Sequence, residues 1–200
     1  DGVMAARGDM GVEIPAQEVP YIQKEIIKKC NDNFKPVITA TQMLDSMIRN
    51  PRPTRAEVTD VANAVYDGTD AVMLSGETAQ GKYPVEALKM MVQIVENTES
   101  HLDYDVLLKK AQQHRRQSIS SAIGFSTVAT ADNLDAKCIV APTMSGATAK
   151  VVSKFKPRAD VIGVSPDEAT LRRMQIYWGV RPLKSIPLKS MEDVCENALE

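Results

Sequence analysis

The chain has 200 residues, 44% of them hydrophobic, and its 24 basic residues nearly balance 26 acidic ones. This supplies enough apolar material for one large or two small domains with hydrophobic cores. A net charge of -2 argues against a nucleic-acid partner, which needs a clustered basic surface. No apolar run approaches the roughly 18 residues of a membrane span, so a membrane partner is not expected either.

Three short apolar runs in the first hundred residues, 2–6, 36–40 and 70–74, are suited to buried parallel strands. Each is followed by a polar or glycine-containing turn and then by a helical pattern. The order of strand, turn and helix therefore repeats three times.

The helices between these runs have ordinary start signals. The first is predicted over about 17–30. The second opens at a capping box formed by Thr54 and Glu57. The third begins at Pro84, and its apolar residues on one face are Val85, Leu88, Met91, Val92 and Val95.

Residues 101–117 are polar and charged and are interpreted as a connecting segment. A second series with shorter spacing follows. A capping box at Ser165 and Glu168, with Pro166 at the first helical position, opens one of its helices. The predicted elements are helix 118–131, strand 138–142, helix 147–155, strand 161–164, helix 166–177, strand 180–186 and a last helix from 190. Alternating strands and helices with short turns predict an open parallel sheet with helices on both faces.

The chain starts at the threshold of a predicted strand and stops within a predicted helix, so we expect a longer polypeptide around it. The three cysteines lie far apart in the sequence, which fits thiols in a reducing compartment. A cytoplasmic protein is the expectation that follows.

Polar side chains follow each of the first three predicted strands. Asp9 comes after the first, Thr41 after the second and Ser75 after the third. The carboxyl ends of parallel strands share one edge, where such sheets place their functional groups. A carboxylate there can hold a hard cation, and the amides of Gly8 and Asp9 can face an anion. Taken singly, Asp9 could equally cap the next element and Thr41 could be packing, but three in succession favour a site.

A further polar loop, Thr143 to Thr148, lies between a predicted strand and a helix. Hydroxyls and free amides at a helix start favour a phosphate group. The loop lacks the Gly-Lys-Ser/Thr of a Walker A motif. A capped helix start without a ligand is an equally good interpretation of these residues alone.

Five motifs together resemble those of the pyruvate kinase family, in the same order and spacing, and the match is dense through residue 95. They are MAARGDMGVEIP (4–15), KPVITATQM (35–43), PRPTRAE (51–57), DVANA (60–64) and MLSGET (73–78). The resemblance implies an α/β fold: the last three βα units of a (β/α)8 TIM barrel in 1–100, a connecting segment in 101–117, and most of the C-terminal α/β allosteric domain in 118–200.

The resemblance also implies the roles of site residues. Asp9 would be one of two acidic ligands of Mg²⁺ (or Mn²⁺). The amides of Gly8 and Asp9, with the Thr41 hydroxyl, would hold the carboxylate of phosphoenolpyruvate. Thr41 and Ser75 would be catalytic residues, Ser75 near the point where the enolate is protonated. An effector phosphate, from a sugar phosphate or a nucleotide, would contact Thr143, Ser145, Gly146 and Thr148, whereas Met144 replaces a residue that is often charged.

The implied activity is transfer of a phosphoryl group from phosphoenolpyruvate to ADP, giving pyruvate and ATP, by a homotetramer that uses Mg²⁺ and K⁺. The catalytic lysine, the second Mg²⁺ carboxylate and the K⁺ ligands would all precede Asp1, so this chain alone is expected to be inactive. Two alternatives remain open: a non-catalytic phosphate-binding module that uses only the loop 143–148, and a scaffolding role for exposed helices.

Overall fold

The computed structural model describes residues 2–114, 118–186 and 193. The chain forms two compact units, Asp1–Leu102 and Asp103–Glu200. The predicted connecting segment contains helix α6 (Tyr104–His114), which belongs to the second unit. The last predicted helix, from 190, falls outside the described residues apart from Asp193. Within the described ranges no helix combines the length and apolarity needed to cross a bilayer.

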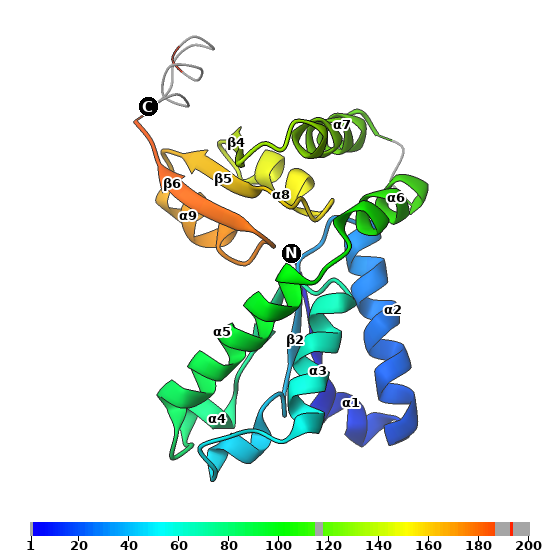
Figure 1. Ribbon diagram of the computed structural model, residues 1–200, viewed down its shortest axis with the longest axis vertical. Helices are drawn as coiled ribbons and strands as arrows, with labels where there is room; N and C mark the ends of the chain where they lie inside the picture. The colour runs from blue at the N-terminus through cyan, green and yellow to red at the C-terminus, as the bar shows by residue number, and fades with distance from the viewer. Residues whose placement is uncertain (1, 115–117, 187–192, 194–200) are drawn as a thin grey trace. The chain divides into compact units, whose positions relative to one another are not determined.

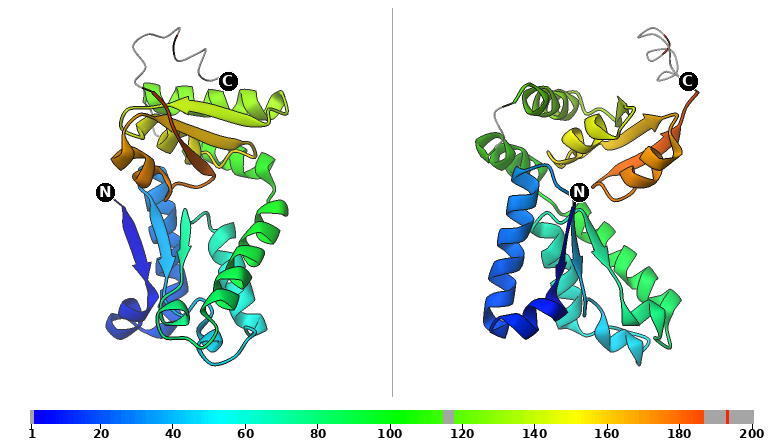
Figure 2. Two further views of the ribbon diagram at one scale, coloured as in Figure 1. Left: turned by 90° about the vertical axis from the view of Figure 1, so that its left-hand side faces the viewer. Right: turned by 180° about the vertical axis from the view of Figure 1, so that it is seen from behind.

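The first unit is built on a parallel sheet in the order β1-β2-β3. Its strands are β1 (Val3–Ala6), β2 (Val37–Ala40) and β3 (Ala71–Met73). Ala6 pairs with Ala40, and Ala40 with Met73, so all three strands end together. Figure 2 shows them side by side. The fold predicted for this half, successive parallel βα units, is confirmed.

The helices of this unit follow their strands in turn. They are α1 (Arg7–Glu13), the 3-10 helix η1 (Ala16–Glu18), α2 (Val19–Asp32), the 3-10 helix η2 (Asp45–Ile48), α3 (Arg55–Tyr66), α4 (Gly76–Ala79) and α5 (Pro84–Ser100). Helix α2 packs on β1 and β2, and α3 packs on α5 (Figure 1). Thr54 caps α3 and forms the predicted capping box with Glu57.

Two details of this unit differ from the sequence prediction. Val3 and Met4 are 42% and 49% exposed, because β1 is an edge strand of the described sheet. On α5 the buried side chains are Ala87, Met91, Ile94 and Thr98, whereas most of the predicted stripe is exposed, including Val85 at 57% and Leu88 at 55%. Helix α5 is apolar over more than one face, and its contact with α3 determines which face is covered.

The second unit contains a parallel sheet in the order β4-β5-β6. Its elements after α6 are α7 (Ile119–Asn133), β4 (Cys138–Pro142), α8 (Ala147–Ser153), β5 (Asp160–Ser165), α9 (Glu168–Met174) and β6 (Val180–Lys184). Helix α8 packs against α7, β4 and β5, and α9 packs against β5 and β6 (Figure 1). The predicted open α/β sheet is confirmed here as well.

The capping box predicted at Ser165 is wrong. Ser165 is the last residue of β5 and is fully buried. Asp167 caps α9 instead, accepting a hydrogen bond from the Thr170 amide at 2.7 Å. The strand pairing extends to Ser165, opposite Lys184, so the helix starts two residues later than predicted.

Candidate active site

The predicted site residues of the first unit lie at one edge of the sheet. Thr41 directly follows β2, Ser75 lies two residues past β3, and Asp9 lies three residues past β1. Since the three strands end in register, these positions share the carboxyl edge. The side chain of Thr41 meets the first of the loops directly: its Oγ1 accepts a hydrogen bond from the Gly8 amide at 2.8 Å.

That hydrogen bond leaves the Thr41 hydroxyl proton available to a ligand, because the oxygen has accepted and not donated. The turn predicted around Asp9 is in fact the first turn of α1, with Arg7, Gly8 and Asp9 as its first three residues. The first N–H groups of a helix have no acceptor within the helix. Asp9 is exposed.

The loop after β2 has a strained backbone. Thr41 has a φ of 71° and Gln42 a φ of 52°, which is uncommon for non-glycine residues and an outlier for a β-branched threonine. Such residues cost about 1–3 kcal/mol each and persist only where the surroundings hold them. The surroundings that hold this loop are therefore part of the site.

Arg7 is the first residue that holds this loop, and its role was not predicted from the sequence. Its side chain is only 13% exposed and forms an ion pair with Asp60 at 2.5 Å. The guanidinium donates to the carbonyl of Ala40 at 3.2 Å and twice to that of Thr41, at 3.2 and 2.7 Å. It also lies 2.8 Å from the sulfur of Met43. An arginine directly after a strand predicted to be buried was the available signal.

Glu77 is the second residue that holds the loop after β2. It is 1% exposed, and its carboxylate accepts from the Leu44 amide at 3.0 Å and from the Ser75 amide at 2.8 Å. One side chain therefore connects the loop after β2 to the loop after β3. Its place within the SGET motif was visible in the sequence, but the contact with Leu44, 33 residues away, was not.

Glu57 extends this hydrogen-bonded region toward α3. Its carboxylate accepts from the amide and hydroxyl of Ser46 at 2.6 Å each, and from the amide and hydroxyl of Thr54 at 2.7 and 2.9 Å. Burial alone would raise the pKa of Glu57, but the hydrogen bonds from Ser46 and Thr54 outweigh it and leave the pKa below its ordinary value. Helix η2, just beyond the strained loop, is thereby tied to the start of α3.

A divalent cation could take Asp9 as one ligand. The carboxylate is exposed and is a hard oxygen donor of the kind Mg²⁺ prefers. In the described ranges, no group of three or more His, Cys, Asp or Glu residues is arranged to hold a metal ion. Asp9 thus fits Mg²⁺ as a single ligand.

The loop between β4 and α8 has a defined conformation. The Thr143 hydroxyl accepts from the Gly146 amide at 3.0 Å, and Gly146 has a φ of 80°. A Cβ on Gly146 would lie 3.2 Å from the Met174 side chain. Ser145 and Thr148 are exposed, and the Arg173 guanidinium from α9 lies 3.5 Å from the Ser145 carbonyl.

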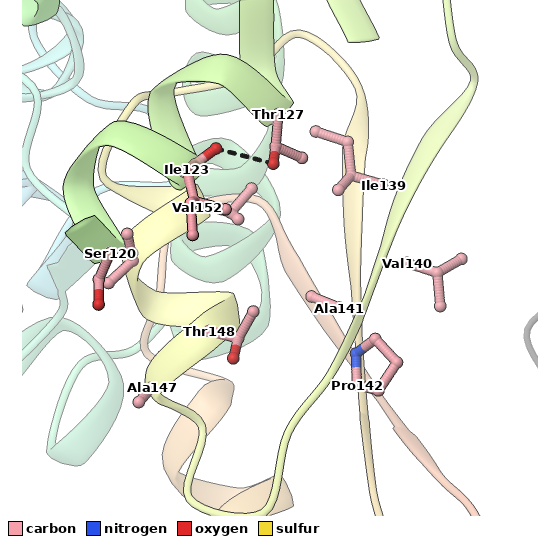
Figure 3. Close-up of a pocket in the computed structure, with 12 residues that line it drawn as sticks. Ser120, Ile123, Thr127, Ile139, Val140, Ala141, Pro142, Ala147, Thr148 and Val152 are labelled. Carbon is pink, nitrogen blue, oxygen red and sulfur yellow. Dashed lines mark hydrogen bonds between the residues drawn. The ribbon is translucent and has the colours of Figure 1, made fainter. Parts of the chain in front are cut away.

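Beside this loop, α7, β4 and α8 enclose a cavity of about 330 Å³ (Figure 3). Most of its lining is aliphatic, and the hydroxyl groups come from Ser120, Thr127 and Thr148. The Thr127 hydroxyl already donates to the Ile123 carbonyl at 2.9 Å. The lining contains no charged side chain, so the cavity does not resemble an anion site.

The fold and this polar edge define an α/β protein whose first unit carries its polar motif residues at the carboxyl ends of parallel strands. Comparison with known proteins gives the family. Residues 1–88 match the model "Pyruvate kinase, barrel domain", and residues 121–200 match "Pyruvate kinase, alpha/beta domain". The two models together match most of the chain, which belongs to the pyruvate kinase family.

Sequence and structure comparisons with individual proteins support the same family. The chain is 50% identical to the pyruvate kinase of Clostridium acetobutylicum and 54% identical to that of Geobacillus stearothermophilus, in each case over all 200 residues. It spans 42% and 34% of those two proteins. A crystal structure of a pyruvate kinase from Cryptosporidium parvum superposes with a TM-score of 0.96 at 43% identity, covering 100% of this chain and 41% of that one.

Proposed function

We propose that this chain is part of an enzyme that transfers the phosphoryl group of phosphoenolpyruvate to ADP, forming pyruvate and ATP. The observation that carries the proposal is the common edge of β1, β2 and β3, where the Gly8 amide and the Thr41 hydroxyl oxygen lie 2.8 Å apart. Family membership supplies the reaction class.

In this proposal the substrate carboxylate binds at the first turn of α1. The Thr41 hydroxyl donates to it, assisted by the amides of Gly8 and Asp9. The Gly8 amide contacts Thr41 already, so it also fixes the direction of the hydroxyl. Ser75, at the next strand end, belongs to the polar region where the enolate takes up its proton.

Asp9 would hold Mg²⁺ or Mn²⁺ in the complete enzyme. A bound divalent cation supplies neutralisation of the charge on the moving phosphoryl group. The negative charge of Asp9 is the contribution of this chain. K⁺ is proposed as the monovalent cofactor, with ligands outside these 200 residues.

A coupled assay of pyruvate formation from phosphoenolpyruvate and ADP tests the proposal on the complete protein that contains this chain. Thr41→Ala should raise the KM for phosphoenolpyruvate, and Asp9→Asn should raise the Mg²⁺ requirement. We further propose that the 200 residues alone give no turnover. Absence of pyruvate formation by the complete protein would contradict the proposed function. Turnover by the chain alone would contradict only the proposal that essential catalytic residues lie outside these 200 residues.

The loop of Thr143, Ser145, Gly146 and Thr148 is proposed to bind the phosphate of a sugar-phosphate or nucleotide effector. Its exposed hydroxyls and the nearby Arg173 guanidinium support the proposal. Arg173 would supply positive charge in a loop where Met144 carries none.

The rival function, a non-catalytic phosphate-binding module, rests on the same loop. Calorimetry separates the two. The module predicts binding of a sugar phosphate and no role for Asp9, whereas the enzyme predicts that Asp9→Asn changes Mg²⁺ binding. Homotetrameric assembly of the complete protein and a cytoplasmic location are proposed from the family alone.

A further inference from the structure

We propose that Arg7 and Glu77 are positioning residues that hold the loop 41–44 from its two ends and so set the geometry of Thr41 and Ser75. The inference rests on the proposed function, since it assigns these residues to the same reaction. We call the pair the loop clamp.

The first end of the loop is held by a cation. The Arg7 guanidinium donates hydrogen bonds to the carbonyls of Ala40 and Thr41. Its planar fork can satisfy both carbonyls from one side chain, whereas a lysine ammonium cannot keep the same geometry. Asp60 balances its charge and fixes its orientation at 2.5 Å. The two contacts hold the carbonyls on both sides of the Thr41 Cα, and so hold its backbone at the left-handed φ of 71°.

The second end is held by an anion. One oxygen of the Glu77 carboxylate accepts a hydrogen bond from the Leu44 amide, and the other accepts one from the Ser75 amide. A glutamine of the same shape has only one acceptor oxygen, so it cannot satisfy both amides. Movement of this side chain therefore displaces the loop after β2 and the loop after β3 together.

These contacts reach the proposed substrate site through Thr41 and Ser75, while the Glu77 side chain is buried and that of Arg7 is only 13% exposed. The Thr41 hydroxyl accepts a hydrogen bond from the Gly8 amide, so a rotation of the loop would also break this contact with α1. Misplacement of a reacting group by about 1 Å can cost about 100-fold in rate. Both clamp residues are thus expected to affect catalysis without touching the substrate.

Arg7→Lys and Glu77→Gln in the complete enzyme test the proposal, with Lys24→Gln as the matched control. Lys24 forms another cross-element ion pair in the same unit, with Asp67, and does not contact the loop. We expect Arg7→Lys mainly to raise the KM for phosphoenolpyruvate and Glu77→Gln mainly to lower kcat. Each should reduce kcat/KM by about 10- to 100-fold, against less than about twofold for the control.

Hydrogen exchange on the unsubstituted enzyme gives a readout that needs no variant to fold. The amides of Leu44 and Ser75 should exchange as slowly as those of the adjoining strands, and Glu77→Gln should accelerate both. Two results would overturn the clamp. One is exchange of the Leu44 and Ser75 amides at the rate of open loops. The other is a kcat/KM per folded molecule of the Arg7→Lys and Glu77→Gln enzymes that equals that of Lys24→Gln. Either result leaves the proposed function standing if the unsubstituted enzyme forms pyruvate.

Discussion

Replacing Glu57 by alanine is expected to destabilise the first unit by about 2–5 kcal/mol. The carboxylate accepts four hydrogen bonds, two from Ser46 at 2.6 Å each and two from Thr54 at 2.7 and 2.9 Å. Loss of a helix cap costs about 0.5–2 kcal/mol. A hydrogen bond to a charged group contributes about 1.5–3 kcal/mol, and the shared, half-buried Ser46 pair counts as one such bond.

Thermal unfolding followed by circular dichroism measures this loss. For a domain of about 100 residues, each kcal/mol lowers Tm by about 4–8 °C, so a fall of at least about 8 °C is expected. Glu86→Ala is the matched control, because Glu86 is also an acidic residue in the first turn of a helix but is exposed. Its loss of helix-dipole interaction is worth about 0.3–1 kcal/mol. Equal Tm values for the two variants would refute the reasoning.

The same carboxylate predicts a pH dependence. The pKa of Glu57 is lower in the folded protein than its ordinary value of 4.5. A depressed pKa adds stability that is fully present above about pH 4.5 and is lost as the pH falls through the folded-state pKa. The free energy of unfolding should therefore decrease below pH 4.5, and less steeply in Glu57→Ala. Parallel curves for the two proteins would contradict this assignment.

Three further substitutions have defined outcomes. Asp9→Asn should raise the Mg²⁺ concentration for half-maximal activity of the complete enzyme by about 10- to 100-fold, measured by metal titration. Gly146→Ala should cost more stability in thermal unfolding than Gly179→Ala. Both glycines have positive φ, which costs an alanine about 1–2 kcal/mol at either position. Only Gly146 also has side chains within 4 Å of an added Cβ. Arg173→Gln should weaken calorimetric binding of a sugar phosphate at the effector loop, while Arg172→Gln on the same helix should not.

The sequence predicts the strands and their common edge because both depend on short-range patterns. Buried parallel strands are continuous apolar runs, and each run here ends where the polar motif begins. Parallel order then brings Asp9, Thr41 and Ser75 to one edge without any knowledge of packing. The capping box of Thr54 and Glu57 is equally local, and it forms as expected.

Features that depend on distant contacts were not predictable in the same way. Arg7 contacts residues 33 to 53 positions away, so nothing in its immediate neighbours indicates its partners. The pattern around Ser165 satisfied a capping box, but pairing of β5 with β6 extended the strand over it. On α5, apolar residues occupy two faces, and only the position of α3 determines that Met91 is buried while Leu88 is exposed.

The contacts that the sequence did not reveal have one physical cause. The segment between β2 and α3 contains no regular ladder, yet part of its backbone is buried, and buried N–H and C=O groups require partners. Arg7 supplies donors to carbonyls at its start, Glu77 accepts the Leu44 amide in its middle, and Glu57 accepts the Ser46 and Thr54 amides toward its end. Charged side chains from α1, α4 and α3 thus replace the strand partners that this segment lacks. The conformation of Thr41 and the stability of the first unit consequently depend on the same three charged side chains.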